Sequence, residues 1–173
     1  MSRGMYHEWL AVTVMLAGVL LSSCAPAPSE PQVATPGSEE PEPVSGLPLA
    51  DVISVAVTGD AGAYRFSVEI ASPDEGCDQY ADWWEVLTED GQLIYRRILA
   101  HSHVNEQPFV RSGGPVAVGP DEVVVVRAHM HPGEYGGSAM RGTAAGRFEP
   151  VELAPDFAAG VEREEPQPAG CDF

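Results

Sequence analysis

The sequence predicts an all-β fold, a single antiparallel β-sandwich of six or seven strands, with a small β-barrel as the alternative. Over residues 49–155, apolar side chains recur with a period of two in short runs. Clusters of Gly, Pro and Asp separate these runs, and no window of helical periodicity competes with them. Short strands bounded by turns are typical of two packed antiparallel sheets.

The first two strands are expected on either side of the turn Gly59-Asp60-Ala61-Gly62. In residues 53–57 every second side chain is apolar, and residues 64–70 alternate Tyr, Phe, Val and Ile with Arg, Ser and Glu. Because successive side chains of a strand point to opposite faces, this pattern predicts a hairpin with one buried face.

The later strands are predicted from similar runs. Residues 83–87 and 92–100 flank a turn that contains Asp90-Gly91, a dipeptide suited to a tight reversal. Three further runs, residues 116–118, 122–130 and 147–153, complete the set.

The Trp pair separates the two faces of the predicted third strand. Trp84 and Val86 share one face, while Trp83 and Glu85 share the other. We therefore assign Trp84 to the core and place Trp83 on the outer face or under a loop. A buried Trp in the third strand resembles the immunoglobulin and fibronectin sandwiches, which implies the same two-sheet architecture.

The first 23 residues are typical of an export signal. Arg3 and the amino terminus supply positive charge, and residues 10–21 are apolar apart from Thr13. This run is too short to span a bilayer, which needs about 20 residues. Leu21-Ser22-Ser23-Cys24 resembles the lipobox of bacterial lipoproteins, which implies cleavage before Cys24 and acylation of its thiol. Several acyl chains are sufficient for stable anchoring.

The remaining regions follow from composition. Residues 24–48 are rich in Pro and Glu and lack aromatic side chains, which predicts a disordered tether. Residues 49–155 form the sandwich, and residues 156–173 form an acidic, Pro-rich tail that we do not expect to fold by itself. The predicted location is the cell envelope, on the extracytoplasmic side of the membrane.

Once Cys24 is acylated, Cys77 and Cys171 are the remaining cysteines. In an oxidising compartment two leftover cysteines most simply form a disulfide, which would fasten the tail to the loop before the third strand. Two free or metal-binding thiols are the alternative.

The histidines are the candidate chemical groups. His101 and His103 form one His-x-His pair, and His129 and His131 form a second, each at the end of a predicted strand. If both strands flank the Trp84 strand, the pairs end at the same pole of the sandwich. With Glu106 they could bind copper or zinc, and Met130, Met140 and Glu134 lie nearby in sequence. The competing interpretation is that these side chains are structural or solvated, and Arg127 would oppose a cation beside His129.

An enzyme is the third possibility. His101-Ser102-His103 followed by Glu106 resembles part of the first cupin motif, which implies a metalloenzyme. The spacing to Glu106 is too short, however, and the second cupin motif is absent. The sequence also has no Gly-x-Ser-x-Gly nucleophile elbow and no phosphate-binding loop.

Charge excludes one class of partner. The formal net charge is −17, from 26 acidic and nine basic residues, all nine of them Arg. This balance repels phosphate backbones and disfavours nucleic-acid binding. Tyr80-Ala81-Asp82-Trp83-Trp84-Glu85-Val86, residues 101–112 and Tyr135-Gly136-Gly137 resemble a set of small uncharacterised bacterial envelope proteins. We therefore expect a membrane-anchored, non-enzymatic binding or structural module without a cofactor, whose ligand is an unidentified protein or polymer.

Overall fold

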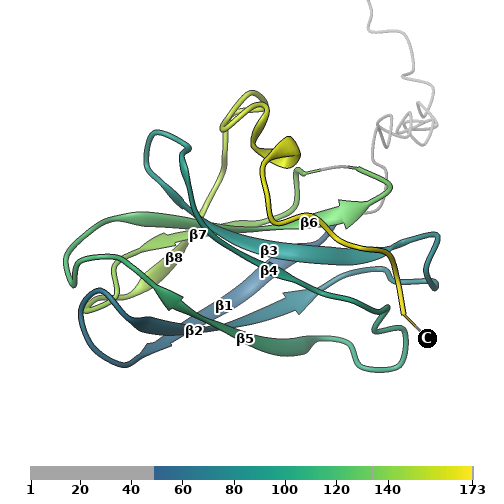
Figure 1. Cartoon of the computed structure of the whole chain (residues 1–173), viewed down its shortest axis with the longest axis horizontal. Helices are drawn as coiled ribbons and strands as arrows, with labels where there is room; N and C mark the ends of the chain where they lie inside the picture. The colour runs from purple at the N-terminus through teal and green to yellow at the C-terminus, as the bar shows by residue number, and fades with distance from the viewer. Residues whose placement is uncertain (1–48, 134, 173) are drawn as a thin grey trace, which may run out of the picture. The chain divides into compact units, whose positions relative to one another are not determined.

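The structure, a computed structural model, describes residues 49–133 and 135–172. The expected signal, the tether and Cys24 lie outside the described residues, as does Glu134. The described part is an all-β fold in which two antiparallel sheets face each other (Figure 1). Its strands are β1 (Asp51–Thr58), β2 (Tyr64–Ala71), β3 (Tyr80–Thr88), β4 (Leu93–Ile98), β5 (Phe109–Val116), β6 (Val124–His131), β7 (Ala139–Gly142) and β8 (Phe148–Val151).

The smaller sheet has the strand order β1-β2-β5, and the larger has the order β4-β3-β6-β7-β8. The two sheets remain separate, so the sandwich prediction is confirmed and the barrel alternative is not. β3 lies between β4 and β6 and is antiparallel to both, as the prediction for the His-bearing strands assumed. Among the described residues, no helix is both long enough and apolar enough to cross a bilayer.

The core lies between the sheets and follows the predicted alternation. Trp84 has no exposed surface, and the alternate residues Phe66, Val68 and Ile70 of β2 are equally buried. Trp83, on the opposite face, is only 3% exposed although it points away from the core. Both assignments are therefore confirmed, and the second raises the question of what covers the outer face.

Two strands differ from the sequence prediction, so the described part has eight strands. β5 begins at Phe109, whereas the sequence predicted a strand only from residue 116. The run contains Gly113-Gly114-Pro115, which is a turn signal in isolation. Gly113 is needed because a Cβ there would lie 2.6 Å from the Tyr95 hydroxyl and 3.0 Å from the Trp84 ring.

β7 was missed for a different reason. It has only four residues and lies between Gly-containing loops, so its period-two signal is too short to recognise. β7 pairs with β6 on one side and β8 on the other, and it connects the last strand to the larger sheet.

The C-terminal segment, which we expected to be fastened by the disulfide but not to fold by itself, also packs against the domain. Residues 155–160 form turns, and the 3-10 turn η1 (Val161–Arg163) follows them. In Figure 1 this segment lies along the outer side of the larger sheet. Val161 is 5% exposed, and together with Leu87, Val125 and Ala139 it forms a second, smaller apolar cluster.

Candidate functional site

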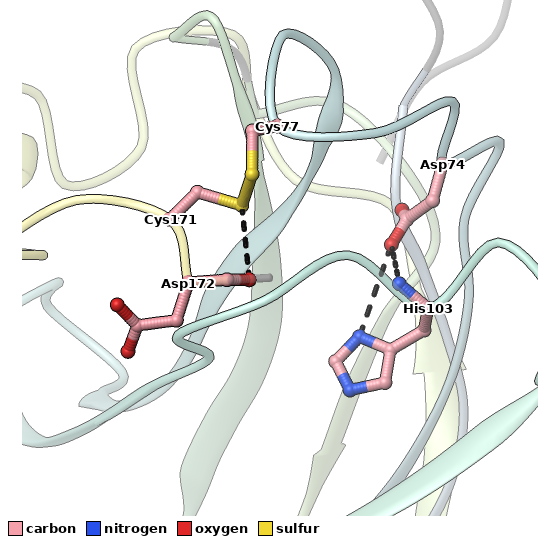
Figure 2. The surroundings of a disulfide bond; sticks show 5 residues. All are labelled: Asp74, Cys77, His103, Cys171 and Asp172. Carbon is pink, nitrogen blue, oxygen red and sulfur yellow. Dashed lines mark hydrogen bonds and ion pairs between the residues drawn. A yellow bond between two sulfur atoms is a disulfide. The ribbon is translucent and has the colours of Figure 1, made fainter.

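The predicted disulfide between Cys77 and Cys171 is confirmed (Figure 2). Cys77 lies in the loop between β2 and β3, so the bond fastens the end of the chain to that loop. One residue further on, the Asp172 backbone N–H donates to the Ala100 carbonyl at 2.6 Å, just beyond β4. The C-terminal segment is therefore held at both of its ends, by β8 and by the disulfide.

A cleft of about 460 Å³ opens beside this disulfide. Its lining includes His101, His103 and Glu106, three of the five predicted metal ligands, together with Cys77 and Asp172. The His101 and His103 rings lie 4.6 Å apart, centroid to centroid. Both residues lie in the loop after β4, which ends at Ile98, so this pair is not at the end of the strand itself.

His103 is a buried, uncharged imidazole at neutral pH. It is 3% exposed and stacks on Phe109, with the ring centroids 3.8 Å apart. Burial, followed by the positive charges of Arg111 and His101, lowers its pKa from 6.5 to about 4. Asp74 accepts a hydrogen bond from the His103 backbone N–H at 2.7 Å, but its carboxylate lies 3.8 Å from Nδ1 (Figure 2). Neither ring nitrogen has a hydrogen-bond partner in the described structure.

The second His pair contacts residues of β3 and not the first pair. His129 lies in β6, where its Nδ1 is 2.6 Å from Asp82 Oδ1 and its ring stacks on Trp83 at 3.7 Å. His131, the last residue of β6, is exposed and lies near the Tyr80 ring. In residues 49–133 and 135–172, no three His, Cys, Asp or Glu side chains are placed to hold a metal ion. The five candidate ligands therefore do not form a single site.

The two nearby methionines do not complete either pair. Met130 and Met140 both belong to the core between the sheets, and each is less than 10% exposed. Met130 alternates with His129 and His131 along β6, so its side chain points to the opposite face of the sheet.

The outer face of the larger sheet carries a buried charge cluster, which we call the Arg-Glu-Arg cluster: Arg96, Glu85 and Arg127. Glu85 has no exposed surface and lies between the two guanidinium groups. Arg96 donates through Nε and Nη2 to Glu85 Oε2, at 2.9 and 2.7 Å, and Arg127 donates through Nε to Oε1 at 2.8 Å. Buried ions need such hydrogen bonds because desolvation costs several kcal/mol for each ion.

The C-terminal segment supplies the remaining acceptors of this cluster. The carbonyl groups of Val161, Glu164 and Pro166 accept hydrogen bonds from Arg96, and the Phe157 carbonyl accepts one from Arg127 at 3.0 Å. The segment therefore covers the outer face with backbone oxygens as well as with apolar side chains. This explains why a region rich in Glu and Pro is ordered: its carbonyls pair with buried cations.

Aromatic side chains surround the same cluster. The Tyr135 ring lies over the Arg127 guanidinium, 3.6 Å from its central carbon, and the Arg96 guanidinium lies 4.5 Å from the Trp83 ring. Trp83 Nε1 donates to the Tyr135 hydroxyl at 3.1 Å. Burial, and then the nearby Glu85 carboxylate, raises the pKa of Tyr135, so its hydroxyl stays protonated.

A cavity of about 820 Å³, which we call the tail pocket, lies between this cluster and the C-terminal segment. Its walls are Arg127 and Ala128 of β6, residues 135–138 of the β6–β7 loop, most of residues 150–160, and Glu162 and Arg163 of η1. The volume falls in the range of about 300–1,000 Å³ that is usual for small-molecule sites.

Comparison with known proteins identifies one informative similarity. A protein of Halomicrobium mukohataei with the printed name "Putative lipoprotein" is 38% identical over 109 residues, which are 62% of this chain and 54% of that protein. The chain thus spans about half the length of the curated relative it matches. No protein-family model matches the chain, and no solved structure matches it. The similarity supports the lipoprotein interpretation of the Leu21-Ser22-Ser23-Cys24 motif.

Sequence reasoning found part of this architecture and missed the rest. It predicted the disulfide between the two cysteines and the position of Trp83 on the outer face. It named no residue of the tail pocket as a ligand-binding residue. A signal was present: Glu85 and Arg127 are charged residues inside mostly apolar strands. Such residues are rarely fully buried unless they are paired, so two on neighbouring strands indicate a buried ion pair.

Proposed function

We propose that this protein is a lipid-anchored protein of the cell envelope whose β-sandwich domain is a non-enzymatic binding module. The tail pocket is its ligand site. The anchor is supported by the lipobox and by the similarity to a protein named as a lipoprotein. The observation that carries the binding function is the tail pocket itself, a cavity of about 820 Å³ walled by a buried cation and by apolar side chains.

The surroundings of the pocket are suited to binding. One wall belongs to the larger sheet, and the opposite wall is a segment that is fastened by β8 and by the Cys77–Cys171 disulfide. A site whose walls are held in place before the ligand arrives spends less of its binding energy on ordering the protein. Nucleic acid is excluded from the proposed ligands because of the charge of −17.

The anchor is tested by the mass of the detergent-extracted protein. We expect a chain that begins at Cys24 and carries acyl groups, whereas Cys24→Ser leaves the protein unacylated and releases it from the membrane fraction. A wild-type protein that retains Met1 contradicts the proposed anchor.

The pocket is tested by a ligand-observed NMR screen of small molecules against the full chain, with two matched variants. Ala159→Trp adds an indole to the pocket lining, and Ala145→Trp adds one to the exposed β7–β8 turn, outside the lining. We expect Ala159→Trp to abolish binding of the hits and Ala145→Trp to leave it unchanged. Equal binding by both variants places the ligand elsewhere and contradicts the proposal.

A second candidate function is binding of copper or zinc in the cleft beside the disulfide. The observation that favours it is that both ring nitrogens of His103 lack a partner among the described residues, while the His101 ring lies 4.6 Å away, centroid to centroid. Two imidazoles leave the other coordination positions to water or to a movement of Glu106. Calorimetric titration of untagged protein with Cu²⁺ or Zn²⁺ tests this: His101→Ala should abolish the binding heat and His131→Ala should preserve it. Absence of heat with the wild-type protein removes this candidate, and with it the cupin-like alternative.

A further inference from the structure

Arg127, a residue in the wall of the tail pocket, has one buried donor with no acceptor among the described residues. The Arg127 side chain is only 7% exposed, and two of its three nitrogens are engaged, Nε with Glu85 and Nη1 with the Phe157 carbonyl. The third, Nη2, is buried without a hydrogen-bond partner in the described part of the chain. Buried polar groups in folded proteins are nearly always hydrogen-bonded, so this group indicates an acceptor that binds from outside the chain.

The net charge of the cluster is a second indication that an anionic acceptor binds here. The Arg-Glu-Arg cluster contains two guanidinium groups and one carboxylate, so it carries an excess positive charge inside a protein that is otherwise strongly acidic. Each nitrogen of Arg96 donates to Glu85, to a backbone carbonyl of the C-terminal segment, or to both. The uncompensated charge and the unused donor therefore coincide at Arg127.

The rest of the pocket limits the ligand to a small anion with an apolar part. Glu162 pairs with Arg163 at 3.0 Å and accepts a hydrogen bond from the Gly160 backbone N–H, so the Arg163 charge is already compensated. Leu153 and Phe157 supply apolar surface to the same lining. The lining also contains the Glu152 carboxylate, so it accommodates little additional negative charge. A phosphate dianion would need several donors and more than one positive charge, whereas a monoanionic carboxylate needs only one donor and one charge.

We propose that the tail pocket binds a monoanionic carboxylate with an apolar body, whose carboxylate accepts a hydrogen bond from Arg127 Nη2. This inference rests on the proposed function, because it assigns a ligand class to the same pocket. The Tyr135 ring covers one face of the guanidinium, so the carboxylate approaches in the guanidinium plane, where the N–H bonds point. Because Nη2 is itself buried, the carboxylate reaches it only when a side chain beside it moves.

The test uses benzoate and benzamide, which have the same shape and differ in charge. In calorimetric titrations of the full chain we expect benzoate to bind at least about tenfold more tightly than benzamide, since a charge-assisted hydrogen bond is roughly twice as strong as a neutral one. Inorganic phosphate should bind more weakly than benzoate. Arg127→Gln should remove the preference for benzoate over benzamide, and the exposed Arg141→Gln should preserve it.

The outcomes separate this inference from the proposed function. If Ala159→Trp abolishes binding of both probes but the wild type binds them equally, the pocket is a ligand site and the carboxylate assignment is wrong. If benzoate binds equally well to Ala159→Trp, it binds elsewhere, and both the site and the assignment fail. If benzoate does not bind while other small molecules occupy the pocket, a water molecule satisfies Nη2 and the inference is overturned. The wild-type comparison decides the question even if Arg127→Gln does not fold.

Discussion

Glu85→Gln is the substitution that most directly tests the role of the Arg-Glu-Arg cluster. It removes the one negative charge between two guanidinium groups and changes the side-chain volume very little. The carboxylate is fully buried and accepts three charge-assisted hydrogen bonds, at 2.7, 2.8 and 2.9 Å. Without it, Arg96 and Arg127 face each other as uncompensated buried cations.

The expected loss in the free energy of unfolding is about 3–5 kcal/mol, because removal of one partner leaves the other charges desolvated and unpaired. The lower end of this range applies if the Gln amide oxygen keeps one of the three hydrogen bonds. A total stability of about 5–15 kcal/mol is usual for a domain, so the substitution removes a large fraction of it. The C-terminal segment should also loosen, since Arg96 holds three of its carbonyl groups.

Urea unfolding followed by Trp fluorescence measures this loss, because Trp83 and Trp84 are both buried. The matched control is Glu89→Gln, which breaks an exposed ion pair with Arg141. Exposed pairs contribute about 0–1 kcal/mol, so this control should unfold close to the wild type.

A double variant distinguishes charge from packing. In Glu85→Gln/Arg127→Gln one of the two uncompensated cations is absent, so the loss should be smaller than the sum of the two single losses. If Glu85→Gln unfolds within about 1 kcal/mol of the wild type, or no differently from Glu89→Gln, the cluster does not hold the outer face together and the reasoning is wrong.

Three further perturbations have definite expected outcomes. Cys77→Ser/Cys171→Ser opens a covalent loop with a sequence separation of 94 residues, so the free energy of unfolding should fall by up to about 4–5 kcal/mol in the chain-entropy model; a denaturation curve that coincides with that of the oxidised wild type contradicts this. His103 has a pKa of about 4 in the folded protein and 6.5 as its ordinary value, so between these pH values the unfolded state binds more protons. The wild type should therefore lose up to about 1.4 kcal/mol for each pH unit of acidification in this window. His103→Phe should lack that contribution, and a stability difference between the two proteins that does not vary between pH 7 and pH 4, measured with a chelator present, rejects the pKa assignment. Gly113→Ala inserts a methyl group against Trp84 and should cost about 1–3 kcal/mol in urea unfolding; wild-type stability would mean that β5 can move away.

Local sequence signals predicted the parts of this protein that depend on one segment at a time. Alternation in residues 64–70 predicted β2 and its buried face, and the position of Trp84 relative to Trp83 predicted which of the two enters the core. The cysteine count predicted the Cys77–Cys171 bond, since few partners were available. Each of these signals is a periodicity or a residue count, which can be recognised without knowing which residues the segment contacts in the folded protein.

The tertiary structure alone decided the features that depend on contacts between segments far apart in the sequence. The strand β5 needs Gly113 because two aromatic rings from the other sheet approach it, and this approach cannot be recognised in a run of Gly and Pro. The strands β4 and β6, which precede the first His-x-His pair and contain the second, flank β3 as expected. Asp82 and Trp83 nevertheless engage His129, while Phe109 stacks on His103. The acidic tail looked unable to fold because its own side chains cannot form a core. It is ordered because its backbone oxygens meet the buried guanidinium groups of a distant sheet, and hydrogen bonding to a backbone carbonyl leaves no trace in side-chain composition.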